Sequence, residues 1–191
     1  MNNPIMRALS RGDGLVSSAW VSQGALSRAV GSGRLVRVLP GIYRAAEVAP
    51  SLRLRGRALA LYDPNAVIVG RAAATLSWYP GIQANLLDAA RAPGYRWTRT
   101  QVPPRHVTRA GGLVLADPAH AIVDLLPETG GELIDRALRL RVTTLEELHR
   151  TLAEQPSRPG NALRRRWLDD SRDRPWSGRT RAAPAGARPP P

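Results

Sequence analysis

The chain contains no cysteine, no phenylalanine and no lysine among its 191 residues. The absence of cysteine excludes disulfides, thiolate metal sites and a cysteine nucleophile, and it fits a cytoplasmic protein. Without phenylalanine, the core has to be built from Leu, Val, Ile and Ala, with five Trp and four Tyr. No apolar run has the length of a membrane span or of a signal peptide's hydrophobic region, so we expect a soluble, cytoplasmic chain with no membrane partner.

All of the basic residues are therefore arginines, 28 of them against 15 acidic residues, for a formal net charge of +13. GC-rich codons, which favour Arg, Ala, Gly and Pro, are one explanation of this excess. The distribution of the positive charge along the chain suggests a second explanation. Residues 1–57 carry a net charge of +7, residues 58–163 carry +1 and residues 164–191 carry +5. Two basic ends around a nearly neutral middle are typical of a protein that binds a polyanion.

The first segment, residues 1–47, has the order helix, short helix, helix and hairpin. Ser22 is a good N-cap for the third helix, and Pro40-Gly41 is a tight turn between two short β-branched strands. A helix followed closely by a two-stranded hairpin predicts a winged helix-turn-helix, in which the helix enters the major groove of DNA. The helices are expected at 4–10, 19–21 and 23–30, and the strands at 34–38 and 42–44.

Polar residues on this helix and hairpin make up the predicted DNA interface. Hairpin arginines suit phosphate contacts because a guanidinium pairs with two phosphate oxygens at once. Gln and Arg in the first turns of the helix could read base edges through paired hydrogen bonds. The alternative is that the arginines form the solvated face of an ordinary hairpin. The predicted DNA-binding residues are Ser22, Gln23, Ser27, Arg28, Arg34, Arg37 and Arg44.

The rest of the chain predicts a second small α/β domain over 50–155 and a basic tail over 156–191, so that the fold class is α+β. Arg, Pro, Gly and Ala dominate the tail, which we expect to be largely disordered apart from a helical turn at 163–167. In the second domain, helices are expected at 52–62, 71–78, 118–126, 132–141 and 144–154, and strands at 66–69, 95–102 and 113–116.

The sequence predicts no metal site, no cofactor and no catalytic residue. The three histidines, His106, His120 and His149, lie on separate expected elements and lack the paired spacing of a zinc site. His120 is expected to be packed inside a helical layer, and Asp124 is expected to pair with an arginine rather than to transfer protons. The run 164–166, three arginines, is either a phosphate contact or a solvated helical face.

The stretch SRAVGSGRLVRVLPGIYR, from Ser27 to Arg44, strongly resembles the N-terminal domain of the AbiEi-like antitoxins of type IV toxin–antitoxin systems. The hallmarks are a helix, then SGRLVRV, then a hairpin end of the PGIYR type. This resemblance implies a DNA-binding transcriptional regulator that binds operator DNA and has a cognate toxin protein as a partner.

Later pieces of the chain resemble actinobacterial proteins in which the antitoxin-like part precedes an endonuclease domain related to very-short-patch repair nucleases. These pieces are GRAAA at 70–74, PPRHV at 103–107, IDRAL at 134–138 and DSRDRPWS at 170–177.

The chain departs from this family pattern in two places. The stretch from Gly14 to Ser22 is short, so the first helix of the helix-turn-helix is expected to shrink to one turn. After Ser177 the family pattern stops, as in a truncated or frameshifted gene, and no Asp or Glu follows Asp173 to hold the divalent metal of such a nuclease. The alternative function is therefore a non-catalytic remnant of a DNA-targeted nuclease, and on either reading we expect no enzyme.

Overall fold

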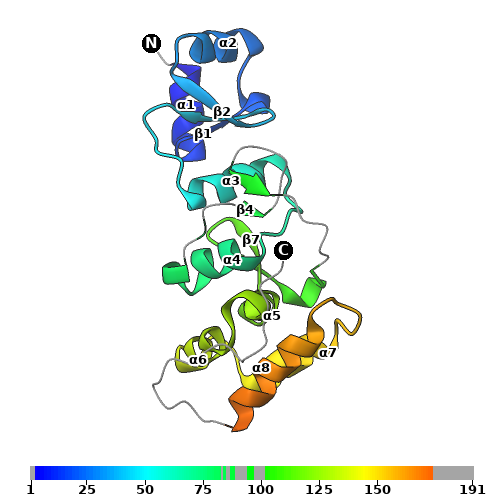
Figure 1. The fold of residues 1–191 in the computed structure, drawn as a ribbon. Coiled ribbons are helices and arrows are strands. Elements are labelled where there is room, and N and C mark those ends of the chain that lie inside the picture. Colours follow the sequence, from blue (N-terminus) through cyan, green and yellow to red (C-terminus); the bar gives the residue numbers. More distant parts are fainter. Residues whose placement is uncertain (1–2, 83, 85–86, 89–93, 97–101, 174–191) are drawn as a thin grey trace. The chain divides into compact units, whose positions relative to one another are not determined.

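The computed structural model describes residues 3–82, 84, 87–88, 94–96 and 102–173. Contacts divide the chain into two compact units, Met1–Ala116 and Asp117–Pro191, called unit 1 and unit 2 below. Helices and small sheets are mixed (Figure 1), which confirms the predicted α+β class. In the part of the chain that the structure describes, no helix has the length and apolar character to cross a membrane.

Unit 1 begins with helices packed on a three-stranded antiparallel sheet. The middle strand of this sheet is the last one in sequence, because the strand order is β1-β3-β2. Tyr43 accordingly lies opposite Val16 on one side and Arg37 on the other. The elements are α1 (Pro4–Gly12), β1 (Leu15–Ser17), the 3-10 turn η1 (Ser18–Trp20), α2 (Gln23–Gly31), β2 (Leu35–Leu39) and β3 (Ile42–Ala45).

Local signals explain where these helices begin. The side chain of Asn3 accepts a hydrogen bond from Ile5 N at the start of α1, and Ser22 accepts one from Ala25 N at the start of α2. The short helix expected at 19–21 is the single turn η1, while strand β1 was not predicted. The core of this part is formed by Ile5, Ala8, Val16, Leu26, Ala29 and Leu35.

Among the described residues in the remainder of unit 1 are two α-helices and two small two-stranded sheets. Strands β6 and β7 form an antiparallel hairpin, and β4 pairs with β5 in parallel. The strand expected at 66–69 is reduced to one parallel bridge between Ile68 and Leu115. The elements are α3 (Leu52–Tyr62), α4 (Gly70–Ser77), η2 (Pro80–Ile82), β4 (Leu87–Asp88), β5 (Tyr95–Arg96), η3 (Pro104–His106), β6 (Val107–Ala110) and β7 (Leu113–Ala116).

The prediction for this region is confirmed only in part. β6 was not predicted, and the strand expected at 95–102 begins as β5 but falls outside the described residues from 97 to 101. The hydroxyl of Tyr95 on β5 donates a hydrogen bond to the carbonyl of Arg55 on α3. Burial raises the pKa of this hydroxyl, which stays a neutral donor and ties β5 to α3.

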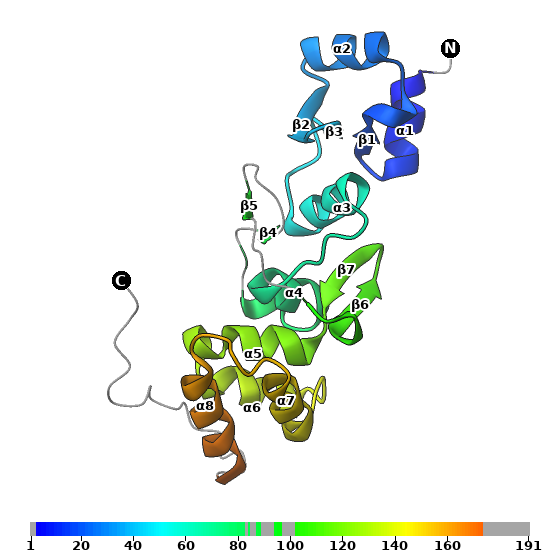
Figure 2. The ribbon, with the colours of Figure 1, turned by 90° about the vertical axis from the view of Figure 1, so that its right-hand side faces the viewer.

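In the described part of unit 2, residues 117–173, four helices pack against one another (Figure 2). Asp117 caps the first of them, with its Oδ1 2.7 Å from His120 N, and Thr144 caps the third, with its Oγ1 3.1 Å from Glu147 N. The carboxylate of Glu147 accepts a further hydrogen bond, from Thr143 Oγ1 at 2.8 Å. The helices are α5 (Pro118–Thr129), α6 (Gly131–Arg139), α7 (Leu145–Ala153) and α8 (Asn161–Asp173).

The unit boundary differs from the predicted boundaries near residues 47 and 155. Helix α3 belongs to unit 1 with the first sheet, since Arg57 forms an ion pair with Asp13 and donates a hydrogen bond to the carbonyl of Gly12. Helix α8 is longer than the turn expected at 163–167, and it buries Trp167 and Leu168 in unit 2. The first part of the predicted tail is thus folded, and residues 174–191 lie outside the described residues.

Candidate nucleic-acid interface

One face of helix α2 packs in the core, and the opposite face is exposed to solvent. Leu26 and Ala29 are buried against α1 and the sheet. Val30, near the end of the helix, is 40% exposed. The predicted base-reading residues Gln23, Ser27 and Arg28 lie on the exposed face, and the N-cap Ser22 is exposed as well.

The hairpin that follows α2 presents two exposed arginines. Arg37 is exposed in the middle of β2, which is an edge strand of the sheet. Arg34 is exposed just before β2, and its Nε donates a hydrogen bond to Ser32 Oγ at 3.1 Å, which directs it back toward the end of α2. Arg34 thus lies at the end of the helix that carries Gln23 and Arg28, and Arg37 follows it on β2.

Arg44 has a different environment from the other hairpin arginines. It is half-buried on the central strand β3, and its Nη1 donates hydrogen bonds to three backbone carbonyls, those of Ala45, Ala46 and Val48. The distances are 3.0, 3.0 and 2.7 Å. Arg44 therefore fixes the turn between β3 and α3. The alternation of inward and outward side chains along the strand did not predict this structural role.

Replacing Arg44 with methionine should lower the free energy of unfolding by about 2 kcal/mol, because three carbonyls lose one charged donor. Arg37→Met is the matched control, since it removes an exposed arginine from the neighbouring strand of the same sheet and should leave stability unchanged within about 0.5 kcal/mol. Thermal unfolding of both full-length variants measures the difference. Equal melting temperatures would contradict the structural role of Arg44.

The tip of the hairpin is tied to the rest of the sheet. Ser18 N donates a hydrogen bond to the carbonyl of Gly41 at 2.8 Å, and Gly41 has a φ of +71°. A Cβ at Gly41 would lie 2.9 Å from Ser18 Oγ, so the turn requires glycine both for its backbone and for this approach. Contacts from this hairpin to a ligand must then come from its strand residues rather than from a projecting loop.

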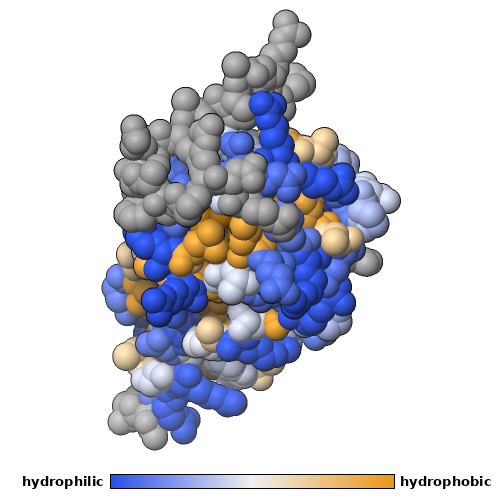
Figure 3. All heavy atoms as spheres, turned by 90° about the horizontal axis from the view of Figure 1, so that it is seen from below, coloured by the Kyte–Doolittle hydropathy of each residue, from blue (hydrophilic) through white to orange (hydrophobic). Residues whose placement is uncertain are grey.

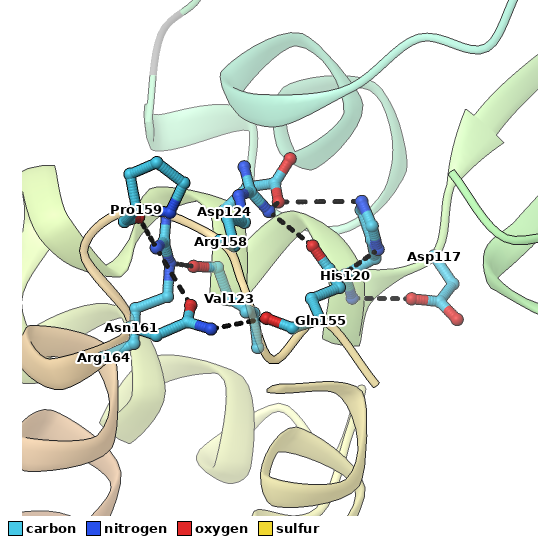
Figure 4. A network of polar contacts seen from close by, with 9 residues as sticks. All are labelled: Asp117, His120, Val123, Asp124, Gln155, Arg158, Pro159, Asn161 and Arg164. Carbon is cyan, nitrogen blue, oxygen red and sulfur yellow. Dashed lines mark hydrogen bonds and ion pairs between the residues drawn. The ribbon is translucent and has the colours of Figure 1, made fainter. Parts of the chain in front are cut away.

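A second cluster of polar groups lies inside unit 2 (Figure 4). Asp124 on α5 forms an ion pair with Arg158, as expected for this acid, and its Oδ1 lies 3.6 Å from His120 Nε2. Gln155 closes a ring, because it contacts both His120 Nδ1, at 3.4 Å, and Arg158, at 3.0 Å. His120 is fully buried, which confirms its prediction as a packed residue.

Arg164 is a buried arginine beside this ring. Its Nε donates a hydrogen bond to the carbonyl of Val123 at 2.8 Å, and its Nη1 donates one to the carbonyl of Pro159 at 2.6 Å. Burial lowers the pKa of the guanidinium, Arg158 lowers it further and Asp124 opposes both. Of the run 164–166, only the second and third arginines are exposed, so the run is not one continuous surface. The cluster holds the loop between α7 and α8 onto α5.

The described residues offer little else for a reactive site. Within the described ranges, no three His, Asp or Glu side chains gather as metal ligands. An apolar patch bordered by hydrophilic side chains is visible in the view from below (Figure 3). In unit 2, Leu140 at the end of α6 is 46% exposed.

Comparisons with known proteins found no protein-family model that matches this chain and no match among curated proteins.

Proposed function

We propose that residues 1–47 bind double-stranded DNA as a winged helix-turn-helix, with α2 as the recognition helix and β2–β3 as the wing. Gln23, Ser27 and Arg28 then face base edges in the major groove, and Ser22 opens the helix at the groove. Arg34 and Arg37 contact phosphates beside it. Arg44 is not assigned a phosphate contact in this proposal, because its guanidinium is hydrogen-bonded to the backbone after β3. The phosphate contacts of the wing are therefore assigned to Arg34 and Arg37.

One observation carries this proposal. A helix with an exposed polar face is followed directly in the chain by a hairpin that carries exposed arginines, on a sheet of order β1-β3-β2. The short hairpin turn limits the wing to phosphate contacts from strand residues. The family resemblance supports the same assignment. It adds that the DNA is an operator and that a toxin protein is the partner, with the protein acting as an antitoxin and regulator in the cytoplasm.

Substituting Arg37 with alanine should weaken binding to every duplex and flatten its salt dependence by about one unit of slope, because each phosphate contact releases roughly one counterion. Gln23→Ala should instead change the preferred sequence with little change in slope. Selection of bound duplexes from random DNA by the full chain gives the preference, and fluorescence anisotropy across a salt series gives the slope. Arg166→Ala, an exposed arginine on α8, is the control. A wild-type chain that binds no duplex at low salt would refute the proposal.

Two glycines of α2 give a sharper test of which end of the helix meets DNA. Gly24 and Gly31 are both exposed, and a Cβ on either would meet nothing within 4 Å. Alanine at each position should leave stability equal or raise it by up to about 1 kcal/mol, since alanine is the better helix former. Gly24→Ala should nevertheless weaken DNA binding, because it adds a methyl group where the helix enters the groove, while Gly31→Ala should not. The opposite pattern would place the other end of α2 in the groove.

A second candidate function is the non-catalytic remnant of a DNA-targeted nuclease. The remnant and the antitoxin would bind DNA through the same residues, 1–47. The two proposals differ in the role of unit 2. Under the antitoxin proposal unit 2 contacts a toxin protein. Co-purification of the full chain with the product of a neighbouring nucleotidyltransferase-like gene would support the antitoxin. Its absence, with DNA binding retained, would support the remnant.

A further inference from the structure

The division into two units changes how the positive charge is distributed. Unit 1 holds 15 arginines and four acidic residues, a formal charge of +11, whereas unit 2 holds 13 arginines and 11 acidic residues, a charge of +2. Arginine is common in both units, so a codon bias toward arginine does not explain the difference in charge between them. The difference is the scarcity of Asp and Glu in unit 1. A surface kept clear of acids is what a polyanion requires.

This scarcity extends beyond the predicted winged helix. Residues 48–116 contain nine arginines and two acids, for a charge of +7, and residues 1–47 contain six arginines and two acids, for a charge of +4. Between Asp88 and Asp117 the chain has no acidic residue at all. The larger share of the charge of unit 1 is thus carried by the part that starts at α3.

Two exposed arginines of this part lie near one hairpin turn. Arg109 is exposed on β6, two residues before the turn Gly111-Gly112. Arg53 is exposed on α3, and its Nη1 lies 3.2 Å from the position that a Cβ on Gly111 would occupy. Both glycines have left-handed backbones, with φ values of +56° and +75°, so the turn carries no side chain that would cover the guanidinium of Arg53.

We propose that Arg53 and Arg109 form a second phosphate-contacting surface of unit 1, whose partner is the backbone of double-stranded DNA. This inference rests on the proposed function and extends it, because the footprint on DNA is then longer than a winged helix alone would cover. The contacts are to phosphate, so they strengthen binding to all sequences and add no preference of their own.

The test is a salt titration with Arg53→Ala/Arg109→Ala in the full chain. Each phosphate contact adds about 0.9 to the slope of log affinity against log salt, so the slope should become shallower by about 1.8. When the salt concentration rises from about 50 to about 200 mM, the affinity of both proteins falls. The factor by which it falls should be about ten times smaller for the variant than for the wild type. The probes are the duplex selected from random DNA and a scrambled duplex of the same length, and both should show the same change.

Arg165→Ala/Arg166→Ala is the matched control, because it removes two exposed arginines from α8 in the nearly neutral unit 2. It should leave the slope as in the wild type. Arg109→Ala alone, on the exposed side of a strand, should reduce the slope by about half as much and keeps the test valid if the double variant unfolds. A wild-type slope in Arg109→Ala, together with a reduced slope in Arg37→Ala, would overturn this surface while the proposed function stands. Wild-type chain that binds neither duplex would overturn both.

Discussion

Replacing Gly130 with alanine is expected to destabilise the protein by about 3 kcal/mol, through backbone strain and a steric clash together. Gly130 ends α5 and begins α6, with φ of 64° and ψ of −157°, a region that glycine alone adopts readily. A Cβ there would lie 2.9 Å from Cζ2 of Trp167. Trp167 is buried on α8 and is held by the helices around it, so the ring cannot simply move away.

Thermal unfolding of the full chain measures this effect as a fall in melting temperature of roughly 10 °C for a chain of this size. Gly112→Ala is the control for strain alone, because its φ is +75° and a Cβ would meet nothing within 4 Å. It should be destabilised by about 1 kcal/mol. A double-mutant cycle with Trp167→Ala isolates the clash, since the two losses should add up to more than the loss in the double variant. Strict additivity would contradict the packing of Gly130 against Trp167.

Asp124→Ala is expected to lower the free energy of unfolding by about 3 to 5 kcal/mol, because it leaves Arg158 without its buried counter-charge. The Asp124 side chain is 9% exposed and that of Arg158 is 22% exposed, so water replaces the lost partner poorly. His120 and Gln155 belong to the same ring and lose their alignment as well. The substitution therefore loosens the loop that joins α7 to α8.

Glu146→Ala is the matched control for Asp124→Ala. Glu146 and Arg150 form an ion pair of 2.8 Å on α7, but their side chains are 83% and 65% exposed. An exposed pair of this spacing is worth less than about 0.5 kcal/mol, so chemical denaturation should hardly change. The double variant Asp124→Leu/Arg158→Met should recover much of the stability that Asp124→Ala loses, because no unpaired charge remains. If Asp124→Ala were as mild as Glu146→Ala, the buried ring would not hold unit 2 together.

These two predictions concern stability, whereas the DNA binding that we propose depends on exposed arginines of unit 1. Arginines that hold the fold together and arginines that stay exposed look alike in the sequence. Arg37 and Arg44 both stand in short β-branched strands, but Arg37 is on an edge strand and Arg44 is on the central one. Only Arg44 meets three carbonyls, because the chain turns back beside β3 on its way to α3. Their different roles could not be read from strand alternation.

The sequence by itself determined the features that depend on neighbours a few residues away. Ser22 caps its helix as predicted, and Pro40-Gly41 forms the expected turn, because caps and turns are closed by groups within three residues. Composition alone also excluded disulfides and cysteine chemistry. The missed strands β1 and β6 are short, and β1 exists through its pairing with β3, some 27 residues further along the chain.

Only the tertiary structure decided where the units divide and which arginines remain on the surface. Arg164 finds its acceptor on Val123, 41 residues before it, and this removes one member of an arginine run from the surface. Arg53 likewise reaches the turn at Gly111 only because α3 packs beside β7. The physical reason is the same in both cases. A guanidinium is buried or exposed according to the carbonyls, acids and glycines that folding brings to it from distant parts of the chain.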